Sequence, residues 1–108
     1  MDASTWDNIG RLKSWLDDEA GKRPETETRL LRVLKIVEEA GEVAEAVHGA
    51  VGGNPRKGAS HTWDDVQKEL ADVIVTAMVA LATLTPDAQS VLGYRLQHLV
   101  DRVLEPQQ

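Results

Sequence analysis

Apolar residues recur every three to four positions along four segments of the chain, the spacing typical of amphipathic helices. Stretches rich in glycine and proline separate these segments at residues 21–24 and 52–58, and the pair Thr85-Pro86 separates the last two. The pattern predicts helices over residues 5–19, 25–51, 62–85 and 87–104. Because β-branched residues fall inside these helical patterns, we predict an all-α fold.

Two of the helix starts carry sequence patterns typical of N-terminal caps. These are Ser4-x-x-Asp7 before the first helix and Thr62-x-x-Asp65 before the third. The apolar positions of the first helix are Trp6, Ile9, Leu12, Trp15 and Leu16. In the fourth helix, the expected inward set is Val91, Leu92, Leu96, Leu99, Val100 and Val103.

The second helix carries a continuous acidic stripe. At 100° per residue, Glu39 and Glu42 fall side by side, and Glu38 and Glu45 follow at the edge of the stripe. The opposite side is apolar and consists of Val33, Val37, Ala40, Val43, Ala44 and Val47. An acidic stripe alone is most often a solvated helix face, so its significance depends on what lies opposite.

The third helix sets one acidic residue in apolar surroundings. Asp72 is the only charged residue from Leu70 to Leu84, and no lysine or arginine occurs from Leu70 to Tyr94. We therefore expect this helix to be central and Asp72 to be covered, and a bare buried carboxylate is costly unless it is paired or binds a metal. Glu69 lies three residues earlier, on the same face.

The second and third helices should form an antiparallel hairpin with its turn near residues 52–61. The Glu39/Glu42 pair then lies roughly 14–18 Å before the turn, and the Glu69/Asp72 pair lies roughly 11–15 Å after it. The two pairs are nearly level. Four carboxylates that face one another form an all-oxygen site, which suits Mg²⁺ or Mn²⁺ better than Zn²⁺.

These acids and their neighbours resemble the signature of a known family. Glu38-Glu39-x-x-Glu42 and Glu69-x-x-Asp72, together with the residues around them at 35–46 and 69–74, resemble the MazG-like all-α nucleoside triphosphate pyrophosphohydrolases. The resemblance implies a four-helix MazG-like bundle with a central antiparallel helix pair. The third helix has more apolar surface than three short neighbours can cover, so we expect a homodimer or homotetramer, which agrees with the assemblies of the family. The resemblance also implies Mg²⁺-dependent cleavage of a (deoxy)nucleoside triphosphate to the monophosphate and pyrophosphate, in house-cleaning or control of nucleotide pools.

The resemblance also suggests roles for individual residues. The expected metal ligands are Glu39, Glu42, Glu69 and Asp72, with Mg²⁺ as the ion and Mn²⁺ as its substitute. Glu38 is the expected catalytic residue, as a general base that holds a water next to the metal. From their charge and position, and not from the resemblance, the candidates for holding phosphates are Lys35, Arg56 and Lys57, with Lys68, Arg95 and Arg102 as further basic residues. Trp6 and Trp63 are candidates for stacking on the base, whereas Trp15 is expected in the core.

Composition limits the remaining function classes. The chain has 108 residues, a net charge of −6 and no cysteine, so a disulfide or a thiolate metal site is excluded. No basic cluster exceeds Arg56-Lys57, which argues against nucleic acid as a partner. There is no long uncharged apolar run and no signal-like start, so we expect no membrane association and a cytoplasmic location. We predict one domain over residues 1–108.

Two alternatives stay open at this point. One is a related helical hydrolase that acts on another nucleotide, such as phosphoribosyl-ATP pyrophosphohydrolase. The other is a non-catalytic helical dimerisation module. The spacing Glu45-x-x-His48 also matches half of a di-iron bundle motif, but such a site needs two copies and the chain has one.

Overall fold

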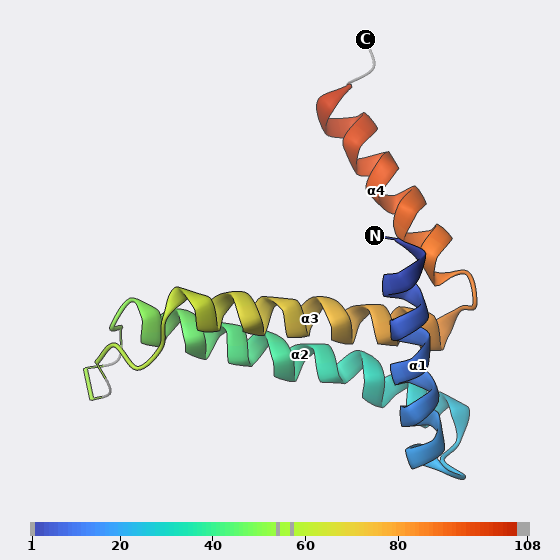
Figure 1. Cartoon of the computed structure of the whole chain (residues 1–108), viewed down its shortest axis with the longest axis horizontal. Coiled ribbons are helices and arrows are strands. Elements are labelled where there is room, and N and C mark those ends of the chain that lie inside the picture. The colour runs from blue at the N-terminus through green and yellow to red at the C-terminus, as the bar shows by residue number, and fades with distance from the viewer. Residues whose placement is uncertain (1, 54, 57, 106–108) are drawn as a thin grey trace.

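The computed structural model describes residues 2–53, 55, 56 and 58–105. It contains four helices, which are α1 (Ala3–Ala20), α2 (Glu25–Ala50), α3 (Trp63–Leu84) and α4 (Ala88–Leu104) (Figure 1). No strand occurs among these residues, and the helix bounds lie within two residues of those predicted. The predicted all-α fold is confirmed.

Two long helices form the centre of the molecule. Helices α2 and α3 run antiparallel and side by side along their length, as predicted (Figure 1). Helix α1 crosses this pair at the end where α2 begins and α3 ends. Helix α4 bends away from α3 by 117° and projects from the pair. The α2–α3 seam therefore lies open over much of its length within one chain.

The apolar core lies where α1 crosses α3. Ile9 of α1 is buried against Met78 and Val79 of α3. Around these three, the partly buried side chains are Trp6, Leu16 and Ala82. This core holds α1 against the end of the hairpin where α2 begins and α3 ends. Further along, α2 and α3 are held together by contacts with each other.

A buried arginine joins three helices beside this core. Arg32 of α2 places its guanidinium 2.6 Å from the Asp17 carboxylate of α1 and donates to the Thr83 hydroxyl of α3 at 3.0 Å. Thr83 in turn donates to the Val79 carbonyl at 2.8 Å. Because the Arg32 side chain is nearly covered, these partners satisfy donors that water cannot reach.

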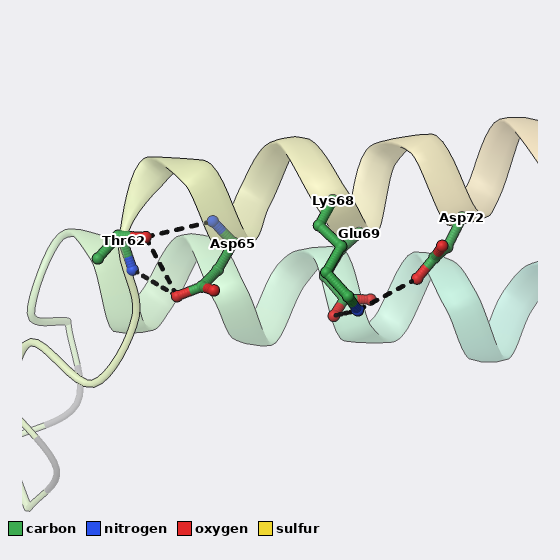
Figure 2. A network of polar contacts seen from close by, with 5 residues as sticks. All are labelled: Thr62, Asp65, Lys68, Glu69 and Asp72. Carbon is green, nitrogen blue, oxygen red and sulfur yellow. Dashed lines mark hydrogen bonds and ion pairs between the residues drawn. The ribbon is translucent and has the colours of Figure 1, made fainter.

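One of the two predicted N-terminal helix caps is present in the structure. At α3, the Thr62 hydroxyl accepts from the Asp65 backbone N–H and the Asp65 carboxylate accepts from the Thr62 backbone N–H, so the capping box is confirmed (Figure 2). The Ser4 cap is wrong. Helix α1 begins earlier because Asp2 accepts from the Thr5 backbone N–H at 2.9 Å, which places Ser4 inside the helix.

The face of α2 that packs on α3 combines apolar residues with one of the acids. Reduced exposure recurs at Arg32, Ile36, Glu39, Val43 and Ala46, a spacing that includes one of the acids. The predicted apolar stripe is mainly exposed, and Val37 at its centre is 69% exposed. The reason is that α2 has one long helix neighbour, so only one of its sides is covered within the chain.

Helices α3 and α4 both expose apolar residues within the single chain, as expected for α3. Leu70 and Ile74 of α3 are about half exposed, so the helix is central but not enclosed. In α4, the predicted inward residues Val91, Leu96 and Val103 are exposed. Leu92, Leu99 and Val100 are partly buried, so half of this inward set is wrong within the single chain. The reason is that α4 diverges from α3 and fully buries only Ala88.

Helix length and hydropathy give one further finding. Among the described residues, no single helix is long and apolar enough to cross a membrane. Helices α3 and α4 reach that threshold only when taken together, across the sharp bend between them.

Candidate metal centre

Three carboxylates from α2 and α3 meet at the seam between the helices. Glu39, Glu69 and Asp72 each place one oxygen within 4.8 Å of the others. Glu69 and Asp72 share a face of α3 because they are three residues apart, and the antiparallel pairing brings Glu39 to the same level. The predicted juxtaposition of these acids across the hairpin is confirmed.

Burial within this acid cluster is uneven. The side chains of Glu39 and Glu69 are 13% and 19% exposed, whereas that of Asp72 is 46% exposed. The oxygen Oε2 of Glu69 is buried and has no hydrogen-bond partner among the described residues. The expectation that Asp72 is the covered acid is therefore wrong, because Asp72 lies at the edge of the seam.

Two lysines pair with the acid cluster. Lys68 Nζ lies 3.5 Å from Glu69 Oε1 and 3.6 Å from Asp72 Oδ2, between the two carboxylates (Figure 2). Lys35 Nζ lies 3.0 Å from Glu38 Oε1 and 3.6 Å from Glu39 Oε1. The pairing of Asp72 was missed from the sequence because Lys68 stands one turn before it, outside the apolar run.

The acids influence one another and the lysines electrostatically. The charge of Glu39 is the main cause that raises the pKa of Glu42, and the neighbouring Glu69 carboxyl adds to the effect. Glu69 and then Asp72 raise the pKa of Lys68, and a hydrogen bond to Glu38 raises that of Lys35. Negative charge is thus concentrated beyond what the two lysines neutralise.

The other two acids of the motif lie at the edge of the cluster. Glu42 is exposed and close enough to Glu39 and Glu69 to feel both charges, but it stands outside the group of three. Glu38 is 61% exposed and is held by Lys35. Their roles as fourth ligand and general base stay predictions.

The candidates for phosphate and base contacts are spread along the molecule. Arg56 is exposed on the connection between α2 and α3, and Lys57 lies outside the described residues. Trp63 is exposed at the first residue of α3, whereas Trp6 is partly buried beside the core. Arg95 and Arg102, the further candidates, belong to α4, which leaves α3 at the end remote from the acids (Figure 1).

One sequence expectation about the tryptophans is wrong. Trp15 was expected in the core, but its side chain is 61% exposed. The core at the α1–α3 crossing uses Ile9 and Leu16 of α1, and Trp15 lies on a different side of that helix.

The donor set of the acid cluster fits a hard divalent cation. All of its donors are carboxylate oxygens, the ligands that Mg²⁺ and Mn²⁺ take, whereas Zn²⁺ sites in proteins are built mainly from nitrogen and sulfur. The buried Glu69 oxygen without a partner is the kind of group that a bound cation satisfies. The residues present therefore fit such an ion.

The sequence matches one family model. The model of the MazG nucleotide pyrophosphohydrolase domain matches residues 26–104, which include α3, α4, nearly all of α2 and every acid of the cluster. The chain belongs to this family, and the resemblance seen in its motifs is confirmed. No curated protein and no solved structure matches the chain. Helix α1 lies outside the matched residues.

Proposed function

We propose that this protein is a nucleotide pyrophosphohydrolase that uses Mg²⁺, or Mn²⁺ in its place, to split a (deoxy)nucleoside triphosphate into the monophosphate and pyrophosphate. One observation carries the proposal: Glu39, Glu69 and Asp72 converge from two helices, and a buried Glu69 oxygen has no hydrogen-bond partner in the described part of the chain. Membership of the MazG family supports the reaction class. A role in house-cleaning or in control of nucleotide pools follows from that reaction.

The acid cluster would hold the ion through Glu39, Glu69 and Asp72, with Glu42 as the fourth ligand. When bound, such an ion offsets negative charge on the α-phosphate and lowers the pKa of a coordinated water. The protein's own task is then to position the reactants, because catalysis of phosphoryl transfer rests mainly on positioning and electrostatics.

Glu38 is the residue that we assign to activation of the attacking water. It adjoins Glu39 in sequence, and its carboxylate is exposed and held at 3.0 Å by Lys35. Glu38 accepts a proton from the water, whose oxygen forms a bond to the α-phosphorus. The bond from that phosphorus to the α–β bridging oxygen breaks, and this oxygen leaves with pyrophosphate.

Lys35 and Lys68 are suited to contact the leaving phosphates, together with Arg56 and Lys57 on the connection. Both lysines are already at the acid cluster through ion pairs of 3.0–3.6 Å. Their side chains are about half or more exposed, so the ammonium groups can move from carboxylate to phosphate without being desolvated first.

We also propose that the protein works as a homodimer or homotetramer. Apolar residues are exposed along three helices, among them Leu30, Leu34 and Val37 of α2, Leu70 and Ile74 of α3, and Leu96 of α4. The radius of gyration is 17.2 Å, whereas a compact chain of this length has about 13 Å. A second copy would cover these faces.

A panel of nucleotides with Mg²⁺ tests the proposed reaction. The panel should include ribo- and deoxyribonucleoside triphosphates and phosphoribosyl-ATP, with pyrophosphate and orthophosphate measured separately. Release of pyrophosphate with the monophosphate supports the proposal, whereas orthophosphate as the product contradicts it. Turnover of phosphoribosyl-ATP alone would favour the related hydrolase, and no turnover of any nucleotide would favour the non-catalytic module.

A further inference from the structure

An apolar cavity adjoins the acid cluster. It has a volume of about 360 Å³ and lies between α1, α2 and α3. Aliphatic side chains from all three helices line it, among them Leu12, Leu16, Leu31, Val75 and Val79. Cavities of this size and character are typical of sites that take a small molecule.

An exposed indole ring forms part of the cavity wall. Trp15 of α1 lines the cavity and is nevertheless 61% exposed. Leaving so much apolar surface in water is unfavourable by roughly 25 cal/mol per Å². A flat aromatic ring at the side of an apolar cavity is suited to stack on another flat aromatic ring.

The cavity and the acid cluster share a boundary. Lys35 lines the cavity and also pairs with Glu38 and Glu39 of the acidic stripe. On α3, Val75 and Thr76 line the cavity one helical turn after Asp72. A molecule with a flat ring in the cavity can therefore extend charged groups past Lys35 to the acids.

A second cation lines the cavity. Arg23, on the connection between α1 and α2, makes no hydrogen bond or ion pair through its side chain among the described residues. Arg32 also lines the cavity, but it is already bound to Asp17 and Thr83. Arg23 is thus free to donate to acceptor atoms on a ligand in the cavity.

We propose that this cavity is the nucleobase subsite, in which Trp15 stacks on the base and Arg23 donates to acceptors on its edge. The proposal rests on the proposed function, because it takes the ligand to be the nucleoside triphosphate whose phosphates lie at Lys35 and the acids. Trp15 and Arg23 both lie outside residues 26–104, which match the family model. The base would then be recognised by residues that lie outside the part of the chain that matches the family model.

Binding of two ligands to the full chain tests this assignment. The first is a nucleoside triphosphate analogue with a non-hydrolysable α–β bridge, and the second is inorganic tripolyphosphate, both with Mg²⁺. Stacking on an aromatic side chain contributes about 1–3 kcal/mol, so Trp15→Ala should weaken binding of the analogue by about 5- to 150-fold. Binding of tripolyphosphate should stay within about twofold, and Trp15→Phe should restore most of the affinity for the analogue.

A matched control and an alternative occupant complete the test. Tyr94→Ala removes another exposed aromatic residue, on α4, that does not line the cavity, and should leave both affinities unchanged. The subsite is wrong if Trp15→Ala binds the analogue as well as wild type, or loses both ligands equally. It is also wrong if Trp15→Ala dissociates an oligomer in light scattering and leaves the analogue affinity unchanged, since a second copy would then cover the cavity.

The same data separate this inference from the proposed function. Binding of the analogue that depends on Trp15, without release of pyrophosphate from any nucleotide, would contradict the proposed reaction and retain the subsite. Release of pyrophosphate with a KM that Trp15→Ala does not change would retain the reaction and overturn the subsite.

Discussion

Lys68 Nζ lies 3.6 Å from Asp72 Oδ2, one helical turn away on the same face of α3. This lysine also reaches Glu69, so one ammonium group serves two of the three clustered acids (Figure 2). The ammonium therefore lies where a divalent cation at the acid cluster would lie, and it pairs with the same negative charges. A bound divalent cation would therefore compete with Lys68 for the same carboxylates.

This competition predicts the effect of Lys68→Met on metal binding. The pair is largely exposed and such pairs are weak, so the variant should bind Mg²⁺ up to about fivefold more tightly. Isothermal titration of Mg²⁺ into wild type and variant measures this. The control is Lys22→Met, on the connection before α2, which should not change the affinity for Mg²⁺. Weaker Mg²⁺ binding by Lys68→Met would contradict the competition.

A second prediction concerns the stability of the protein without metal. Glu69→Gln should raise the melting temperature by a few degrees, because it removes one of several neighbouring negative charges. The Oε2 atom of Glu69 is also buried with no hydrogen-bond partner among the residues that the structure describes. Asp72→Asn should have a smaller effect, since Asp72 is half exposed and paired with Lys68. Calorimetry in a chelating buffer measures both. A larger rise in melting temperature for Asp72→Asn than for Glu69→Gln would contradict this prediction.

Much of this site could be predicted from the sequence, because helical spacing determines which residues share a face. Glu69 and Asp72 are three residues apart, and an antiparallel hairpin of α2 and α3 brings them level with Glu39. The burial of each acid could not be predicted. It depends on how α2 is rotated against α3, and a helix with one neighbour can place either an acidic or an apolar side at the seam.

The same limit explains the errors at the two ends of the chain. Val91 and Leu96 have the spacing of a buried helix face, but α4 turns away from α3. The spacing identifies the apolar side of the helix, but it does not show which element, if any, packs against that side. Trp15 was expected in the core for the same reason. Arg32 was not singled out, because its partners Asp17 and Thr83 are distant in sequence and become neighbours only when α1 crosses the hairpin.

The third prediction concerns this buried arginine. Arg32→Ala should lower the free energy of unfolding by about 1.5–3 kcal/mol, the range for hydrogen bonds to charged groups, since it removes the link between α1 and the α2–α3 pair. Urea unfolding gives the value. The control is Arg29→Ala, which breaks an exposed pair with Glu25 within α2 and should cost below about 0.5 kcal/mol. Equal losses would contradict a special role for Arg32.

The pH dependence of stability provides the fourth prediction. A hydrogen bond from Lys13, and then one from Arg32, lowers the pKa of Asp17 below its ordinary value of 3.8. A lowered pKa in the folded state means that this stabilisation is complete above about pH 4 and is lost as the pH falls through the folded value. The melting temperature of wild type should therefore decrease as the pH is lowered below 4. The melting temperature of Asp17→Asn should decrease less steeply over the same range.

Asp18→Asn serves as the control for this pH dependence, because the Asp18 side chain makes no ion pair among the described residues. Its melting temperature should follow that of wild type from pH 6 to pH 2. If Asp17→Asn also follows wild type throughout, Asp17 does not contribute to acid sensitivity.

The fifth prediction concerns assembly. Light scattering at micromolar concentration should show a dimer or a tetramer, and Ile74→Glu should shift it toward the monomer, because a charge would enter the exposed apolar face of α3. Val51→Glu is the matched control, since Val51 is equally aliphatic and exposed but lies just past the end of α2. A wild-type monomer would contradict the proposed homo-oligomer.

The most direct test of the central claim is Mg²⁺-dependent release of pyrophosphate by variants of one acid from each helix. Glu39→Gln on α2 and Asp72→Asn on α3 should each lower turnover by at least about 100-fold, because both would hold the same ion. Glu27→Gln, an exposed acid in the first turn of α2, should retain turnover. If either cluster variant turns over nucleotide at the wild-type rate, the acids of α2 and α3 do not form one catalytic metal site.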